Sequence, residues 1–468
     1  MYDSIKSCVK VRNDTSGFFA CETGVRQGEN LSPFLFSIFL SDLEDYLRDN
    51  NVIGLETVSL QCQEQIEKFI SLFVLLYADD TIILAESDVE LQNALFVFEN
   101  YCTNWKLSVN VDKTKVIVFS KRKIRRNAKF LLYGSELEIV DSYPYLGLLF
   151  NFNGKFTVSK KRLSEQAQKA LFALYRKLRN ISIPVDLQLK LFDTLIEPIL
   201  LYACEIWGYE NVEILEKIHL QFLKRVLHVR SSTPNFMVYG ETGHYPLIIR
   251  IKQRMLTFWS NILQSENKLC YTLYQLMFKL QRSENCTFKW MDFLKSIFND
   301  IGLTYVWDGQ FSVSKTDIKI FMKQILCDQY IQSWFNSINS SSRGHFYSAF
   351  KPEFGLEKYL IKLKIDKRIE ISKLRCNNLK FPSETGRWNN IPRHERLCTL
   401  CDDRQLGNEF HYICICKHEE ISRLRSKFIP RYYTENPRED KLHGLLRYCN
   451  VKVLNNLAIF LKKIKVFF

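Results

Sequence analysis

Two adjacent aspartates lie between two apolar runs in the segment FVLLYADDTIILAES, residues 73–87. The runs 73–76 and 81–85 are predicted to be strands joined by a tight connection at Ala78, Asp79 and Asp80. Aspartates in such a turn often do no more than accept local backbone hydrogen bonds. Because both runs are apolar on both faces, however, the hairpin is expected in the interior of a sheet, where the carboxylates need a partner such as a divalent cation.

A second group of chemically active side chains lies near the end of the chain, in RLCTLCDDRQLGNEFHYICIC. Most of the 14 cysteines are isolated and are interpreted as reduced thiols. Four residues form the pattern C-x2-C-x9-H-x4-C: Cys398, Cys401, His411 and Cys416. This spacing suits a tetrahedral structural Zn²⁺ site. Cys414 and His418 are alternatives for the fourth ligand, and chance clustering in a cysteine-rich chain is the competing interpretation.

The composition indicates a folded protein with a polyanionic partner. Of the 468 residues, 46% are hydrophobic and 14% aromatic, and 65 Lys and Arg against 51 Asp and Glu give a net charge of +14. An ordinary basic protein is the alternative. Basic residues that could contact a nucleic-acid backbone follow the cysteine group: Arg423, Arg425, Lys427 and Arg431. No secretory signal or run of about 18 apolar residues is present, so we expect a cytoplasmic and nuclear protein without membrane contact.

The elements that must position the aspartates form an α+β pattern. A helix is expected to start with Ser32 as N-cap and Pro33 in its first turn, and a second helix to cover about 88–105. KLSVNV and VIVFS, which flank residues 112–115, are predicted to be strands. Long helical patterns begin near residue 157. The expected division of the chain is 1–155 for an antiparallel sheet with packed helices, 156–280 and 281–390 for helical regions, and 391–468 for the cysteine-containing region.

Four segments then occur in an informative order: GVRQGENLSPFLFSIFLSDL (24–43), YADD (77–80), LSVNVDKTKVIVFS (107–120) and YLGLLF (145–150). Together they resemble the reverse transcriptase of non-LTR (LINE-like) retrotransposons. LIEPILLYACEIWG and LEKIHLQFLKRVL extend the resemblance, as does the cysteine-rich segment. It implies part of a right-hand polymerase palm, then a helical thumb and connector, and a zinc-knuckle-like C-terminal region.

The resemblance also implies roles for individual residues. Asp79, assisted by Asp80, would bind Mg²⁺ in a two-ion site where a primer 3′-hydroxyl attacks a dNTP. Further positions would contact nucleotide, template or primer: Tyr77, Gly24, Arg26, Gln27, Gly28, and the primer-gripping turn of Tyr145, Leu146 and Gly147. Lys113 would help pyrophosphate to leave, although a lone lysine is more often a solvated surface residue. Taken alone, Leu146 and Leu148 are predicted to be core residues.

The chain departs from the family pattern at its beginning. The family's third carboxylate lies in a segment resembling D-x-x-x-A-F-D upstream of GVRQG, and this chain has there only Asp3 and Asp14, neither in such a context. We therefore expect an N-terminally truncated element, without fingers, first palm strand or endonuclease, that is inactive alone. RNA template, DNA primer or target, and dNTP are the expected partners, and no obligate protein partner is predicted. The alternative is a catalytically dead nucleic-acid-binding remnant or a domesticated protein.

Overall fold

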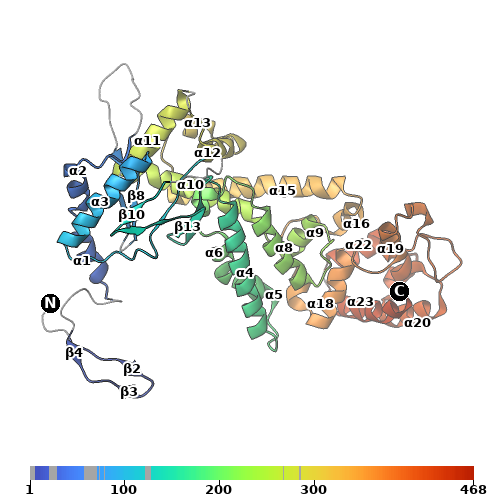
Figure 1. The fold of residues 1–468 in the computed structure, drawn as a ribbon. Helices are drawn as coiled ribbons and strands as arrows, with labels where there is room; N and C mark the ends of the chain where they lie inside the picture. The colour runs from blue at the N-terminus through green and yellow to red at the C-terminus, as the bar shows by residue number, and fades with distance from the viewer. Residues whose placement is uncertain are drawn as a thin grey trace. The chain divides into compact units, whose positions relative to one another are not determined.

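The computed structural model describes residues 6–20, 29–56, 71–72, 74–77, 80–121, 128–266, 268–283, 286–448 and 450–468. The chain divides into two compact units, residues 1–155 and 156–468, which are treated separately below (Figure 1). Within the described residues, no helix is both long and apolar enough to cross a membrane.

Within its described residues, the first unit combines short antiparallel hairpins with three helices. Its helices are α1 (Ser32–Phe39), α2 (Leu43–Asp49) and α3 (Asp88–Asn104). Its strands are β1 (Lys6–Ser7), β2 (Lys10–Val11), β3 (Asp14–Thr15), β4 (Phe19–Ala20), β5 (Leu55–Glu56), β6 (Ser71–Leu72), β7 (Val74–Tyr77), β8 (Asp80–Ile83), β9 (Lys115–Val116), β10 (Leu131–Leu132), β11 (Ser135–Glu136), β12 (Glu138–Ile139), β13 (Ser142–Tyr145) and β14 (Leu148–Asn151). Among the described residues each strand pairs with one partner, and only β9 with β12 is parallel.

Helix α3 organises the core of this unit. It begins with a capping box: the Ser87 hydroxyl accepts a hydrogen bond from the Glu90 amide at 3.2 Å, and the Glu90 carboxylate accepts one from the Ser87 amide at 3.2 Å. One face packs against α2, where Leu43 and Leu47 are fully buried. The Tyr101 hydroxyl donates to Asp42 Oδ1 at 2.6 Å, which attaches α3 to the start of α2. The helix expected at 88–105 is therefore confirmed.

Three local expectations are wrong in detail. Leu31, not Ser32, is the N-cap of α1, and its side chain makes no capping hydrogen bond. The segment KLSVNV is irregular, and only Lys115–Val116 of this region forms a strand, because the partner available to it is the two-residue strand β12. The β7–β8 hairpin does not lie inside a sheet: its strands pair only with each other among the described residues, and residues 81–84 are half-buried.

The second unit is helical. Its elements are α4 (Thr157–Lys177), α5 (Val185–Leu195), α6 (Glu197–Leu200), α7 (Cys204–Trp207), α8 (Glu213–Leu227), α9 (Asn235–Thr242), α10 (Leu247–Leu263), α11 (Lys268–Arg282), α12 (Lys289–Asp300), α13 (Thr304–Asp308), α14 (Lys315–Asp317), α15 (Lys323–Ser340), α16 (Gly344–Phe350), α17 (Lys358–Lys362), α18 (Ile365–Arg375), α19 (Pro382–Trp388), α20 (Glu419–Phe428), α21 (Arg431–Thr434), α22 (Glu439–Arg447) and α23 (Val451–Ile464). Single π-helical turns cover Ile318–Met322 and His411–Ile415, and 3₁₀ turns cover Arg393–Glu395 and Lys465–Phe467.

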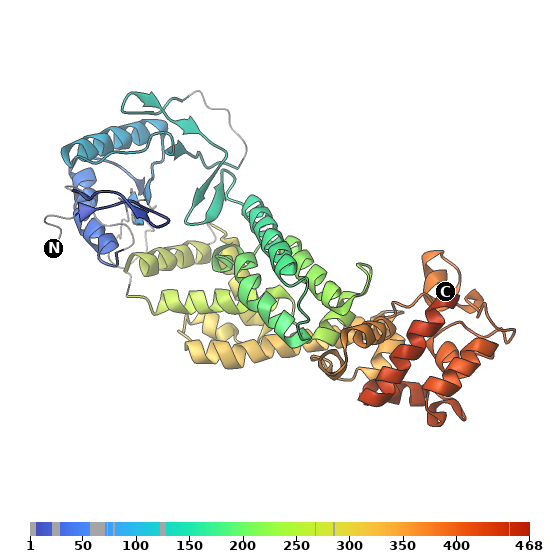
Figure 2. The same ribbon diagram turned by 90° about the horizontal axis from the view of Figure 1, so that it is seen from below.

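These helices pack around α8 and α18. Helix α4 lies against α6 and α8, and α10 packs against α7 and the π-helical turn Ile318–Met322 (Figure 2). Helix α18 packs against both α8 and α23, and α23 in turn packs against α20. Helix α18 therefore connects the helices around α8 to the C-terminal group α20–α23.

A buried ion pair holds several of these helices together. Glu241 and Arg375 are exposed by 0% and 1%, and the guanidinium donates to both carboxylate oxygens, at 2.8 and 3.0 Å. Its remaining amino group donates to the Leu446 carbonyl at 2.7 Å. Glu241 also accepts hydrogen bonds from the Tyr347 and Tyr359 hydroxyls. Burial alone would raise the pKa of Glu241, but the charge and hydrogen bonds of Arg375, the charge of Lys351 and the Tyr359 hydroxyl together outweigh this effect and hold that pKa below its usual value. The pair thereby joins α9, α16, α17, α18 and α22.

We expect Arg375→Met to lower the free energy of unfolding by about 3–5 kcal/mol, because it leaves the Glu241 carboxylate buried without its cation. Urea denaturation followed by far-UV circular dichroism measures the loss. Arg254→Met is the matched control, because Arg254 pairs with Glu205 in a partly exposed setting and should cost less than about 1 kcal/mol. Equal losses in the two variants would contradict a special role for the buried pair.

Candidate functional site

The Asp-Asp segment lies where β7 and β8 meet. Tyr77 pairs with Asp80 in the antiparallel register, so only residues 78 and 79 separate the two strands. Asp80 is the first residue of β8 and its side chain is exposed. The structure therefore has the predicted hairpin, with a two-residue connection of the shortest common kind.

A second hairpin, β13–β14, carries the YLG turn. Tyr145 pairs with Leu148, and the turn residues Leu146 and Gly147 have φ angles of 47° and 79°. Both turn residues are left-handed, as in the two-residue turns that match strand twist. Leu148 is buried, as predicted. Leu146 is not a core residue, because its side chain is 40% exposed at the tip of the hairpin.

Strand β13 connects this hairpin to the other two motifs. Tyr143 and Tyr145, two residues apart, lie on the same face of β13. The Tyr143 hydroxyl donates to the backbone carbonyl of Lys113 at 3.1 Å. Burial raises the pKa of Tyr145, and the negative charge of Asp80 raises it further, so Asp80 lies within electrostatic range. The structure thus brings together the Asp80 hairpin, the NVDKT loop and the YLG turn, and leaves the Lys113 side chain exposed.

Several predicted site residues lie outside the described residues: Gly24, Arg26, Gln27, Gly28 and Asp79. The side chain of Tyr77 also lies outside the described part. Among the described residues, Asp80 is the one carboxylate of the β7–β8 hairpin, and Asp14 is exposed on β3.

The C-terminal cysteines and histidine converge as a metal site requires. The ligand atoms of Cys398, Cys401, His411 and Cys416 all lie within 4.8 Å of one another. Cys398 Sγ lies 3.7 Å from Cys401 Sγ and 4.0 Å from Cys416 Sγ, close to the roughly 3.8 Å expected for two sulfurs on one tetrahedral zinc ion. His411 Nε2 lies 3.4 Å from Cys401 Sγ. The alternatives Cys414 and His418 do not belong to this cluster.

Neighbouring groups orient and neutralise these ligands. His411 Nδ1 lies 3.4 Å from Gln405 Oε1, which leaves Nε2 facing the cysteines, and burial lowers the pKa of His411 so that the ring is neutral. The Leu400 amide donates to Cys398 Sγ at 3.4 Å. Arg425 is buried and donates to the Cys416 carbonyl, so it places a cation beside the sulfurs. The set of three thiols and one imidazole fits Zn²⁺.

One of the four basic residues expected to contact a nucleic-acid backbone is misassigned. Arg425 is buried against Cys416, whereas Arg423, Lys427 and Arg431 are exposed. Sequence spacing could not distinguish them, because the identity of the inward face of α20 depends on where α23 packs.

Known proteins similar in sequence to this chain indicate its family. Residues 2–150 match the family model for reverse transcriptase (RNA-dependent DNA polymerase). An RNA-directed DNA polymerase from mobile element jockey of Drosophila funebris is 26% identical over 226 residues, which are 46% of this chain and 22% of that protein. A Pol polyprotein from type-1 retrotransposable element R2 of Popillia japonica is 28% identical over 234 residues, 46% of this chain and 29% of that protein.

The first unit is therefore similar to reverse transcriptases, and the chain is similar to the polymerases of LINE-like retrotransposons. The family match covers the first unit up to β14, which includes the Asp80 hairpin and the YLG turn. A third relative, a probable RNA-directed DNA polymerase from transposon BS of Drosophila melanogaster, is 24% identical over 53% of this chain and 26% of its own length. The matched region thus spans less than a third of the length of each of these three relatives.

Sequence reasoning missed three supporting side chains of these two regions. Tyr143 ties the NVDKT loop to β13, Gln405 orients His411, and Arg425 lies beside the cysteines. The position of Tyr143, two residues before Tyr145, was the available signal, since alternate strand residues share a face. Nothing in the sequence indicated Gln405.

We expect Leu146→Asn to raise the free energy of unfolding by about 1 kcal/mol, because asparagine tolerates the left-handed conformation that strains leucine. The half-exposed leucine gives up little burial in return. Urea denaturation provides the measurement. The matched control is Leu148→Asn, two residues away but buried, which should cost about 3 kcal/mol or more. A loss of similar size for Leu146→Asn would show that its side chain is packed in solution.

Proposed function

We propose that this chain carries the metal-binding half of the active site of an RNA-directed DNA polymerase that copies retrotransposon RNA. The observation that supports this proposal best is the meeting of the Asp80 hairpin, the Lys113 loop and the YLG turn in a unit that matches the reverse transcriptase family. Such work on RNA template, DNA primer and dNTP would take place in the cytoplasm and nucleus.

Each motif has a physical task in this proposal. Asp79 and Asp80 would hold Mg²⁺, which supplies charge stabilisation to the attacking and leaving oxygens of nucleotidyl transfer. Leu146 projects from the strained turn toward solvent, where it can contact the sugar face of a primer. The exposed Lys113 would meet the phosphates of the dNTP and the departing pyrophosphate. Gly24, Arg26, Gln27, Gly28 and Tyr77 keep the nucleotide, template and primer roles that the resemblance assigns to them.

A second candidate function is nucleic-acid binding without catalysis. It is favoured by the sequence, because the 468 residues contain no D-x-x-x-A-F-D segment. A catalytic metal site that lacks a ligand loses far more activity than the roughly 10–100-fold cost of a change in the residues that orient the ligands.

We expect no primer extension by the purified 468-residue polypeptide on an RNA template with a DNA primer, dNTPs and Mg²⁺, because its sequence has no D-x-x-x-A-F-D segment to supply the third carboxylate. Gel analysis of the extended primer measures the activity. Salt-sensitive binding of the template–primer should remain.

The Asp79→Ala variant is the control for this experiment. Extension by the unmodified chain that disappears in Asp79→Ala would show that another residue completes the site. The non-catalytic candidate would then be wrong. Absence of both extension and binding would refute both candidate functions.

We further propose that Cys398, Cys401, His411 and Cys416 bind one structural Zn²⁺ in a knuckle-like fold. The support is the mutual distance of the four ligand atoms, all within 4.8 Å, and the burial of Cys398, His411 and Cys416. A closed set of four protein ligands with no open position serves folding, not catalysis.

We expect purified protein to contain about one zinc ion per chain, and the double variant Cys398→Ser, Cys401→Ser to contain none. Inductively coupled plasma mass spectrometry measures the metal. Cys414→Ser is the matched control, since Cys414 is buried nearby but outside the cluster, and its zinc content should be unchanged. Loss of zinc from Cys414→Ser, with zinc retained in Cys416→Ser, would show that Cys414 and not Cys416 is the fourth ligand. A folded protein without metal would refute the site.

A further inference from the structure

A small pocket of about 220 Å³ lies in the second unit, where three segments far apart in sequence meet. His228 and Arg230 follow the end of α8, residues 378–381 follow α18, and residues 461–468 complete the C-terminal helix α23 and its 3₁₀ turn. Its lining includes five basic side chains: His228, Arg230, Lys373, Lys380 and Lys465. Burial and neighbouring cations lower the pKa of His228, so the positive charge comes from Arg230 and the three lysines, and no Asp or Glu side chain is among the lining residues.

The lysines of this cationic pocket are only partly neutralised. Lys373 and Lys465 both approach one oxygen of Glu370, at 3.7 and 3.8 Å, so two cations share one carboxylate. Burial lowers the pKa of Lys373, and Lys465 adds to this effect. Lys380 is exposed and has no ion pair within the described part of the chain. An anion that entered the pocket would relieve the crowding of positive charge.

The Arg230 guanidinium is fixed in position by its neighbours. Its guanidinium donates to the Asn378 carbonyl at 3.1 Å, and its own amide donates to the Asn378 side chain at 2.8 Å. The guanidinium lies over the Trp388 ring, 4.0 Å from the centroid. Glu384, the nearby carboxylate, is engaged with Arg387 at 3.1 Å and Arg343 at 3.8 Å. Arg230 therefore keeps further donors on a fixed, planar group that matches phosphate geometry.

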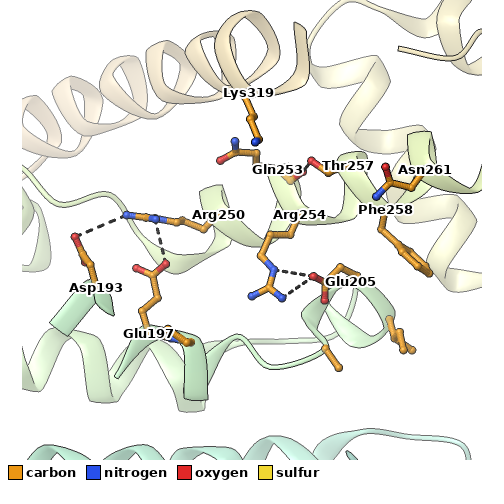
Figure 3. Close-up of a pocket in the computed structure, with 13 residues that line it drawn as sticks. Asp193, Glu197, Glu205, Arg250, Gln253, Arg254, Thr257, Phe258, Asn261 and Lys319 are labelled. Atoms are coloured by element: carbon orange, nitrogen blue, oxygen red, sulfur yellow. Dashed lines mark hydrogen bonds and ion pairs between the residues drawn. The ribbon is translucent and has the colours of Figure 1, made fainter. Parts of the chain in front are cut away.

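The larger pocket of the same unit, about 660 Å³, provides a contrast (Figure 3). Its arginines form ion pairs with carboxylates that also line the pocket. Arg250 pairs with Asp193 and Glu197, and Arg254 donates from Nε and one amino group to Glu205 Oε1. Three carboxylates thus offset most of its positive charge, and an anion would have to displace them. In the small cationic pocket, Lys373 and Lys465 share Glu370, and no Asp or Glu side chain is among the lining residues.

We propose that the cationic pocket binds a backbone phosphate of the nucleic acid. The proposal rests on the proposed nucleic-acid function of this chain and assigns to it a contact in the second unit. A volume of about 220 Å³ accommodates a phosphate group but is below the roughly 300–1,000 Å³ typical of sites for whole small ligands. The bound strand thus continues beyond the pocket, with one phosphate inside it.

The wall of the pocket is continuous with the cysteine–histidine cluster. The rings of Phe381 and Phe468, both lining residues, pack on Tyr412, with centroids 4.8 and 4.7 Å away. Tyr412 follows the cluster residue His411 directly. The phosphate contact and the zinc-binding region therefore share one rigid aromatic group.

The test is the affinity of the full 468-residue chain for a fluorescein-labelled single-stranded RNA of about 20 nucleotides, longer than one common binding site. Fluorescence anisotropy is recorded over a series of KCl concentrations. The triple variant Lys373→Ala, Lys380→Ala, Lys465→Ala should bind about tenfold more weakly near 0.1 M salt, with a slope of log K against log salt smaller by about 0.7 for the phosphate lost.

The matched control removes three other lysines, Lys295→Ala, Lys315→Ala and Lys323→Ala, which are exposed in the same unit and outside the pocket. It changes net charge equally but should alter affinity by less than about threefold. Lys380→Glu alone, at an exposed position, keeps the test valid if the triple variant fails to fold. It should weaken binding without lowering the melting temperature.

Each outcome decides a separate question. Equal losses in the pocket and control variants would overturn the pocket while leaving nucleic-acid binding in place. Absence of RNA binding by the unmodified chain at every salt concentration would overturn the proposed function together with the pocket. Stabilisation of the unmodified chain by inorganic phosphate, absent in the triple variant, with RNA affinity unchanged, would show that the site takes free phosphate and would overturn the backbone contact.

Discussion

The Arg375 guanidinium lies between the Glu241 carboxylate and the Leu446 carbonyl with almost no exposure to solvent, and the second unit is arranged around it. A buried arginine is costly to dehydrate unless all its donors are used, and here they are directed at three acceptors that come from α9, α22 and the segment before α17. The pair therefore acts as a geometric constraint. Helix α18 can pack only in the position where all three acceptors lie within hydrogen-bonding distance of the Arg375 guanidinium. Since α18 also packs on α8 and α23, the same constraint positions both walls of the cationic pocket.

The first unit depends on a different kind of constraint, imposed by short turns. A two-residue connection fixes the register of β7 and β8, and the left-handed Leu146 and Gly147 fix that of β13 and β14. Leucine in this conformation is strained, and the Leu146 side chain is 40% exposed. Strain retained on an exposed apolar tip is a feature of binding sites, and it agrees with a turn that contacts a primer strand.

Charge is distributed differently over the parts of the second unit. Around α10, arginines and carboxylates neutralise each other, whereas at the junction of α8, α18 and α23 the cations outnumber the carboxylates. Beside the cysteines, Arg425 compensates the negative charge that thiolates would carry. The formal net charge of +14 does not show where basic side chains lack a neighbouring carboxylate. Only those places are informative about an anionic partner.

The amino-acid sequence by itself determined the local elements and the chemistry of the ligands. The capping residues Ser87 and Glu90 fixed the start of α3, the Asp-Asp pair marked the hairpin, and Cys398, Cys401, His411 and Cys416 already had metal-binding spacing. These features depend on residues close in sequence, whose geometry is set by backbone hydrogen bonds and covalent reach. Only the tertiary structure placed Tyr143 against the Lys113 loop, turned Arg425 inward and gathered His228, Lys373 and Lys465 into one pocket. Contacts of this kind join residues that are up to hundreds of positions apart in the sequence. They depend on which faces of the helices pack together, and the periodicity of a single helix does not determine that packing.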